Sequence, residues 1–250
     1  MKDVLGWRCK FGVITPSTNT IVQPEYDDLR PEGVTNHISR MHISDNSINN
    51  DLDFEKLIFN IDEALESAVD RVNTCIPDSI ILGISAESIW GGGIEAASKV
   101  KDRIKIRSGI NNVFIAADAL SLALRSYKVS GKVGILTPYM PVAEKHLQKY
   151  MDDIGYNVSS MIHLKCKSPV MIAHTPLENI KIALTQLVSE GATAIIQFGA
   201  NLPMAKFSHL AEKWLDIPVI SVNVATYWHS LRANKIYDQI TGFGKLMEKY

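Results

Sequence analysis

The chain has 250 residues, of which 46% are hydrophobic and 21% charged, with a net charge of −1. This is the balance of a folded globular protein, and its near-neutral charge gives no reason to expect a nucleic-acid or membrane-surface partner. No run approaches the roughly 18 apolar residues of a membrane span. Cys9, Cys75 and Cys166 are odd in number and widely spaced, so we expect neither a disulfide nor a metal site, and a cytoplasmic location.

The first half of the chain alternates predicted strands and helices. Apolar runs predict strands buried on both faces, and apolar residues at helical spacing predict helices. The predicted strands cover residues 9–15, 35–43, 78–84 and 112–116. The predicted helices cover residues 21–29, 54–73, 94–103 and 118–127.

The second half repeats this order. Its predicted strands cover residues 132–137, 156–164, 192–198 and 217–222. Its predicted helices cover residues 141–154, 176–190 and 204–215, and a last long helix opens at 225–233. Such alternation predicts an α/β fold of two pseudo-symmetric Rossmann-like halves, each a mainly parallel sheet flanked by helices, with a cleft between them. We expect residues 1–116 plus 223–250 to form the first half and residues 117–222 the second.

Two phrases of the sequence recur about half a chain apart. KFGVITPS at 10–17 returns as KVGILTPY at 132–139, and SIILGIS at 79–85 is echoed by AIIQFGA at 194–200. Each is an apolar strand that ends in a polar loop. Repeated units around a pseudo-twofold axis would bring these loops to one cleft, where open α/β sheets bind ligands.

The loop after the first predicted strand carries Ser17, Asn19 and Thr20. Their hydroxyl and amide groups suit a carboxylate or phosphate at a helix N-terminus, although an ordinary helix cap would use the same residue types. The sequence has no G-x-G-x-x-G after a predicted strand, no phosphate-binding P-loop and no G-x-S-x-G elbow. We therefore expect no nucleotide cofactor.

Five segments together resemble a known family. They are the P-S-x-N-T loop at 16–20, the T-P-Y loop at 137–139, the strand ends near Ser85 and Asn201, and the N-x-A-T-Y-W-H segment at 223–229. This order is similar to the maleate cis-trans isomerase and arylmalonate decarboxylase group of the aspartate/glutamate racemase superfamily. The resemblance covers nearly the whole chain. It implies cofactor-independent chemistry on small carboxylic or dicarboxylic acids, and it makes a homo-oligomer plausible.

The chain departs from this family at the residues that usually react. The family places a cysteine at the end of the central strand of each half, and the matching positions here are Ile84–Ser85 and Phe198–Gly199. Two-cysteine racemisation, cysteine addition to a double bond and protonation by a single cysteine therefore do not carry over.

The carboxylate-binding positions do carry over from the resemblance. It implies that Ser17, Asn19 and Thr20 hold one carboxylate. It also implies that Tyr139 donates its hydroxyl to a second carboxylate or carbonyl. Ser85 and Asn201 would then hydrogen-bond the reacting group, because an enolate-like intermediate needs donors aimed at it.

Without cysteine, another group must move the proton. Glu87 follows a strand end, and partial burial there would raise its pKa toward acid–base use; an exposed carboxylate or a salt bridge is the alternative. His229 is the second candidate for this role. The alternative is that His229 packs between the two halves. Trp90 either covers the ligand or packs in the core.

Three functions remain open. The first is an isomerase- or decarboxylase-type enzyme acting on a small acid through an enediolate-like intermediate, with Glu87, Ser85 and Tyr139 as catalytic residues. The second is a carboxylate-binding pseudoenzyme that has lost the reaction with the thiols. The third is a cysteine-free hydrolase or lyase that uses Glu87 and water.

Overall fold

A computed structural model describes residues 3–86, 91 and 93–250. It contains two four-stranded sheets with the strand orders β2-β1-β3-β4 and β6-β5-β7-β8, and every neighbouring pair is parallel. The first sheet is formed by β1 (Cys9–Pro16), β2 (Val34–Met41), β3 (Ser79–Leu82) and β4 (Val113–Phe114). The second is formed by β5 (Val133–Thr137), β6 (Val158–His163), β7 (Ala194–Gln197) and β8 (Val219–Ser221). The matching orders confirm the predicted pair of similar α/β halves.

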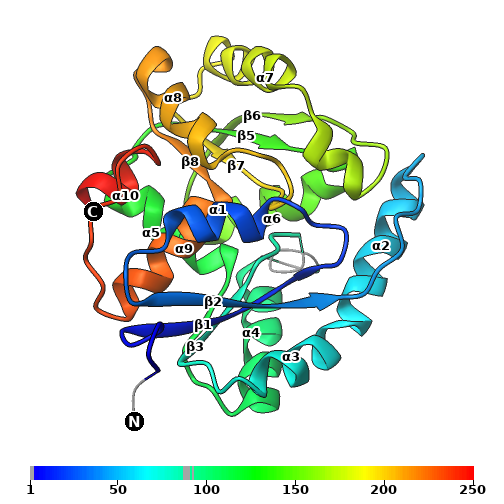
Figure 1. Cartoon of the computed structure of the whole chain (residues 1–250). Coiled ribbons are helices and arrows are strands. Elements are labelled where there is room, and N and C mark those ends of the chain that lie inside the picture. Colours follow the sequence, from blue (N-terminus) through cyan, green and yellow to red (C-terminus); the bar gives the residue numbers. More distant parts are fainter. Residues whose placement is uncertain (1–2, 87–90, 92) are drawn as a thin grey trace.

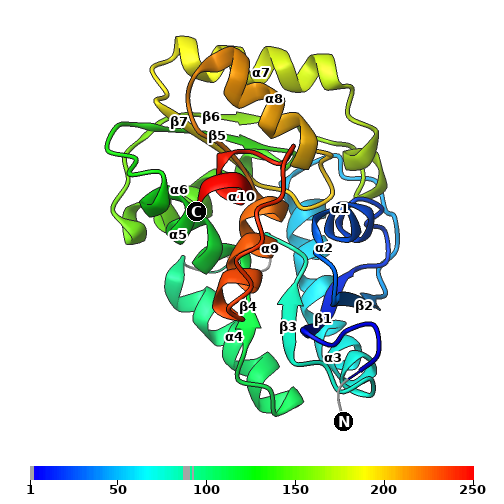
Figure 2. The same cartoon turned by 60° about the vertical axis from the view of Figure 1, so that its left-hand side comes forward.

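The helices form layers around the two sheets. In the first half of the chain they are α1 (Val22–Leu29), α2 (Asp51–Glu63), α3 (Leu65–Asn73), α4 (Ile94–Ser108) and α5 (Ala116–Ser126). In the second half they are the 3₁₀ turns η1 (Pro141–Ala143) and η2 (Val170–His174) and the helices α6 (Glu144–Ile154), α7 (Leu177–Ser189), α8 (Ala205–Leu215), α9 (Val222–Ala233) and α10 (Lys245–Lys249). Figures 1 and 2 show α3 and α4 outside the first sheet, α7 and α8 outside the second, and α5, α6 and α9 between them.

Burial explains why the central strands are so apolar. Every residue of β3, β5 and β7 is buried, because helices cover both faces of each parallel sheet. Helix α9 then brings the chain back toward the first half, where the Tyr227 ring lies 5.6 Å from Phe11 and 4.8 Å from Tyr26 between centroids. This contact joins the C-terminal segment to residues of β1 and α1, and the domain boundaries stay a prediction.

Two predicted helices differ from the structure. The single helix expected at 54–73 is two helices, α2 and α3, with a break at Ala64, whose N–H bonds to Ile61 O in a tight turn. The apolar spacing continues through this break, so periodicity alone did not reveal it. Helix α9 ends at Ala233 instead of opening a long helix, and the chain continues without helix to α10. Within the described ranges, no helix has the length and apolar character that a membrane crossing requires.

Candidate functional site

A small cavity lies where the carboxyl ends of both sheets face each other. Its lining includes the polar residues Thr18, Asn19, Tyr139 and Asn201, together with Gly199 and Ala200. Its volume is about 50 Å³, so the cavity is small but has room for water. The recurrent strand-end loops therefore meet as the repeat predicted.

The centre of this site is a hydrogen-bonded group that joins the two halves. Ser85 Oγ lies 2.8 Å from the Tyr139 hydroxyl and accepts a hydrogen bond from Gly199 N, also at 2.8 Å. Ser85 is fully buried and Tyr139 is 5% exposed. Burial raises the pKa of Tyr139 well above its usual value, even though bonds from Ser85 and the Ala86 backbone lower it. The phenol therefore stays protonated at neutral pH and is a hydrogen-bond donor.

In the loop after β1, the predicted carboxylate-binding side chains make hydrogen bonds to the backbone of the protein itself. Asn19 Oδ1 accepts from the N–H groups of Ile21 and Val22, each at 2.9 Å, so this side chain caps the start of α1 as well as lining the cavity. Ser17 Oγ bonds the backbone N and O of Ile43 and holds the loop against the next segment. Thr18, which belongs to the same predicted loop of hydroxyl and amide side chains, lines the cavity.

Asn201 connects this loop to the second half. Its Oδ1 accepts from Thr20 N at 2.9 Å, and its Nδ2 donates to Pro169 O at 2.8 Å. The backbone of Thr20, rather than its hydroxyl, therefore makes the contact with Asn201. The predicted pairing of the two strand-end loops is present, with Asn201 as a bridge between them.

One wall of the cavity is apolar and was not predicted. Helix α2 contributes Phe54, Leu57, Ile58 and Ile61, and further apolar residues complete the wall: Pro16, Ile43, Ile84, Ala86, Pro169 and Ile172. The Phe54 ring lies 5.1 Å from the Tyr139 ring. The helical spacing of the α2 residues was visible in the sequence, but it indicated core packing. Only the position of α2 in the folded chain makes that stripe a wall of the cavity.

The described lining residues carry no charged side chain. A bound carboxylate would therefore be held by neutral hydroxyl, amide and backbone N–H groups. In such surroundings these dipoles act more strongly than in water, because little solvent screens them. The arrangement suits a reaction in which negative charge spreads over oxygen atoms.

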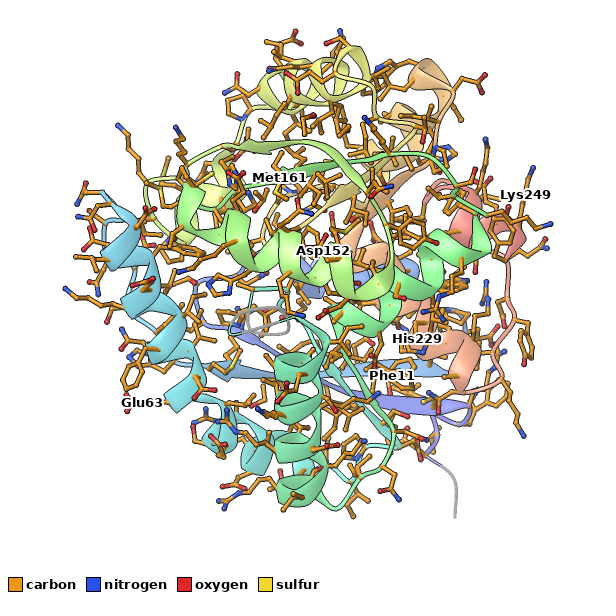
Figure 3. The ribbon with its side chains drawn as sticks, turned by 180° about the vertical axis from the view of Figure 1, so that it is seen from behind. Phe11, Glu63, Asp152, Met161, His229 and Lys249 are labelled. Carbon is orange, nitrogen blue, oxygen red and sulfur yellow. The ribbon has the colours of Figure 1, made fainter. Side chains whose placement is uncertain are left out.

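The remaining predicted residues lie elsewhere or outside the described part. Glu87 and Trp90 fall outside the described residues. His229 lies on α9, labelled in Figure 3, where its ring packs 5.1 Å from that of Phe114. It lines a separate surface groove with Lys101 and Asp118, and burial lowers its pKa. The structure therefore does not bring His229 to the cavity.

None of the three cysteines belongs to the described lining of the cavity. Cys9 is buried at the amino end of β1, and burial raises the pKa of its thiol to about 12. Burial also raises the pKa values of Cys75 and Cys166. At the two strand ends where the family resemblance places thiols, the cavity is lined by Ile84 and Gly199. No group of three metal-ligating side chains occurs among the residues that the structure describes.

Comparisons with known proteins agree with this geometry. A family described as arylmalonate decarboxylase matches residues 12–247. A maleate isomerase from Alcaligenes faecalis is 23% identical over 257 residues, covering 95% of this chain and 96% of that protein. Among solved structures, the maleate cis-trans isomerase of Nocardia farcinica, bound to TRIS, is similar with a TM-score of 0.83 at 21% identity, over 96% of this chain and 98% of that one. A structure of arylmalonate decarboxylase gives a TM-score of 0.72 at 14% identity, over 95% of this chain and 98% of that one.

The similarity to the two solved structures, both under 25% identical, establishes the fold. The match to the family model establishes the family. The match spans nearly the whole chain, including both strand-end loops and the Ser85–Tyr139–Gly199 group. The expected isomerase- or decarboxylase-type relationship is thereby confirmed at the level of the family. The chain belongs to the arylmalonate decarboxylase family.

Proposed function

We propose that this protein is a cofactor-independent enzyme of isomerase or decarboxylase type. Its substrate is a small carboxylic or dicarboxylic acid, and the reaction passes through an enediolate-like intermediate. The observation that carries the proposal is the contact of Ser85 with Tyr139 and with Gly199 N across the two halves, beside the cavity. These groups come from different halves, so the folded state holds them in place before any substrate binds.

The chemistry follows from where charge develops. Loss of carbon dioxide, or transfer of a proton from the carbon next to a carboxylate to Glu87 as the proposed base, leaves an electron pair that spreads onto the carboxylate oxygens. Neutral donors aimed at these oxygens stabilise that charge more than they stabilise the starting acid. The new C–H bond then forms with a proton from an acid, for which Glu87 remains the proposed residue. The apolar wall from α2 would accept the substituent on the reacting carbon.

The first experiment is proton NMR of the purified protein in D₂O with malonates, maleate, 2-amino acids and 2-hydroxy acids. Deuterium entering the carbon next to a carboxylate, or a new product, supports the proposal. Tyr139→Phe should then lower kcat by about 10²–10³-fold, as expected for the loss of one oxyanion donor. Glu87→Gln should abolish turnover and leave binding within a few-fold. Turnover by Glu87→Gln would reject that residue as the acid–base group.

A second candidate function is a carboxylate-binding pseudoenzyme. It is favoured by one observation, that Ile84 and Gly199 line the cavity where thiols would act in the family. Binding of acids from the same panel without exchange or product would support it. A hydrolase or lyase that uses Glu87 and water is the third possibility, and ¹⁸O from labelled water in the product would identify hydrolysis.

A further inference from the structure

Several hydrogen bonds hold the cavity wall formed by residues 199–201, here called the wall loop. Gly199 N donates to Ser85 Oγ, and Asn201 Oδ1 accepts from Thr20 N. Both contacts come from strand-end loops of the first half. The third contact reaches Ala200 O, which accepts from Asn223 Nδ2 at 2.9 Å.

This third contact leads to a carboxylate that the proposed reaction does not use. Asn223 Nδ2 also donates to Glu25 Oε2 at 2.6 Å, and Glu25 Oε1 accepts from Ala205 N at 2.8 Å. Glu25 lies on α1 of the first half, while Ala205 begins α8 and Asn223 lies in the first turn of α9. One carboxylate thus joins three helices and, through Asn223, reaches the cavity wall.

We propose that Glu25 is a positioning residue whose ionised carboxylate fixes the wall loop through Asn223. Both carboxylate oxygens are acceptors only when the group is ionised, and here both are used. Protonation turns one oxygen into a donor that faces an N–H group, so at least one of the two contacts weakens. The orientation of the Asn223 amide, and with it the bond to Ala200 O, then changes with the charge on Glu25.

The surroundings of Glu25 favour its titration near neutrality. Burial raises the pKa of Glu25 to about 7, and bonds from Ala205, Asn223 and Met204 oppose this shift without cancelling it. Asp28 on the same helix raises the pKa further. Asp28 itself is paired with Lys206 of α8 at 2.6 Å, and the phenol of Tyr26 stays protonated because burial raises its pKa. The charge of Glu25 therefore changes around pH 7.

The coupling can be tested without a substrate. Amide ¹H–¹⁵N shifts of the uniformly labelled protein would be followed from about pH 5 to 8.5, which brackets the titration range of a carboxyl with this raised pKa. We expect the amides of Ala205 and Asn201 to titrate together in the wild type, because the Asn201 nitrogen shares its peptide group with Ala200 O. Glu25→Gln should remove both titrations. Asp28→Asn, the matched control on the same helix, should retain them.

Asn223→Ala separates a specific relay from a general electrostatic effect. In this variant Ala205 N should still titrate, since it bonds Glu25 directly, while the Asn201 nitrogen should lose most of its amplitude. A wall loop that does not titrate in the wild type, or that still titrates in Glu25→Gln, would overturn the proposal. An unchanged Asn201 titration in Asn223→Ala would also overturn it.

The role of this coupling in turnover rests on the function proposed above, but the coupling itself does not. If the acid panel yields a substrate, KM of the wild type should fall as pH rises through about 7, and Glu25→Gln should flatten that profile while Asp28→Asn keeps it. If no acid is turned over, the proposed function fails, and the amide titrations still decide whether Glu25 controls the wall loop.

Discussion

Ser85→Ala is the most informative single change for the stability of the site. The serine hydroxyl is buried between Tyr139 OH and Gly199 N. Its removal deprives the buried Gly199 N–H of this acceptor and takes one partner from Tyr139, which keeps its bond from the Ala86 backbone. An orphaned buried donor costs about 1–3 kcal/mol and a lost hydrogen bond about 1 kcal/mol, so we expect a destabilisation of about 2–4 kcal/mol.

The matched control is Ser221→Ala. Ser221 is 1% exposed at the end of β8, and its hydroxyl has no hydrogen-bond partner among the described residues. Its removal should change stability by no more than about 0.5 kcal/mol. Urea unfolding followed by circular dichroism and tryptophan fluorescence would measure both variants, with coincident transitions as the check on two-state behaviour. If Ser85→Ala lies within about 0.5 kcal/mol of Ser221→Ala, the hydrogen-bonded group does not stabilise the fold as we argue.

Three further outcomes are expected. Gly199→Ala should lower stability by more than about 1 kcal/mol in the same urea assay. The reason is that φ of Gly199 is +97° and an added Cβ would lie 2.3 Å from Pro138 Cγ. Unchanged stability would show that alanine causes no strain at this position. Glu25 has a folded pKa of about 7 against a usual 4.5, so the folded state holds the proton more tightly and stability should fall as pH rises from about 4.5 to 7, by on the order of 3 kcal/mol. The Glu25→Gln variant should lack this loss, and equal pH profiles for the two proteins would contradict the assignment. Ile58→Ala should cost about 2–5 kcal/mol and let the cavity accept larger apolar substituents in competition binding; unchanged selectivity would remove α2 from the proposed binding wall.

Much of the fold was predictable because burial on both faces makes the central strands continuous apolar runs. The recurrence of GVITP and GILTP marks two matching strand ends in the sequence itself, and in the folded chain both lie at one cavity. The helix break at Ala64 was not predictable, since an apolar stripe continues unchanged while the axis of the helix turns.

The side-chain roles within the site were less predictable than its position. Whether Asn19 caps α1 or faces a ligand depends on a loop conformation that the residue type does not specify, and in the structure it caps α1 and also lines the cavity. Glu25 has no motif to mark it. Its contacts join residues nearly 200 positions apart in the chain, and only the folded structure brings them together.

The unlike residues at the two strand ends, Ile84 and Gly199, have a stereochemical consequence. Gly199 has a left-handed backbone with Pro138 against it, so a side chain cannot be added there without moving the chain. Ile84 lines the same cavity with an ordinary side chain, and the smaller cysteine would fit in its place. A laboratory selection for a thiol in this cavity would therefore obtain it first at position 84. If the proposed reaction takes place, such a thiol would deliver a proton to only one face of its planar intermediate, and chiral chromatography should find one enantiomer of the product in excess.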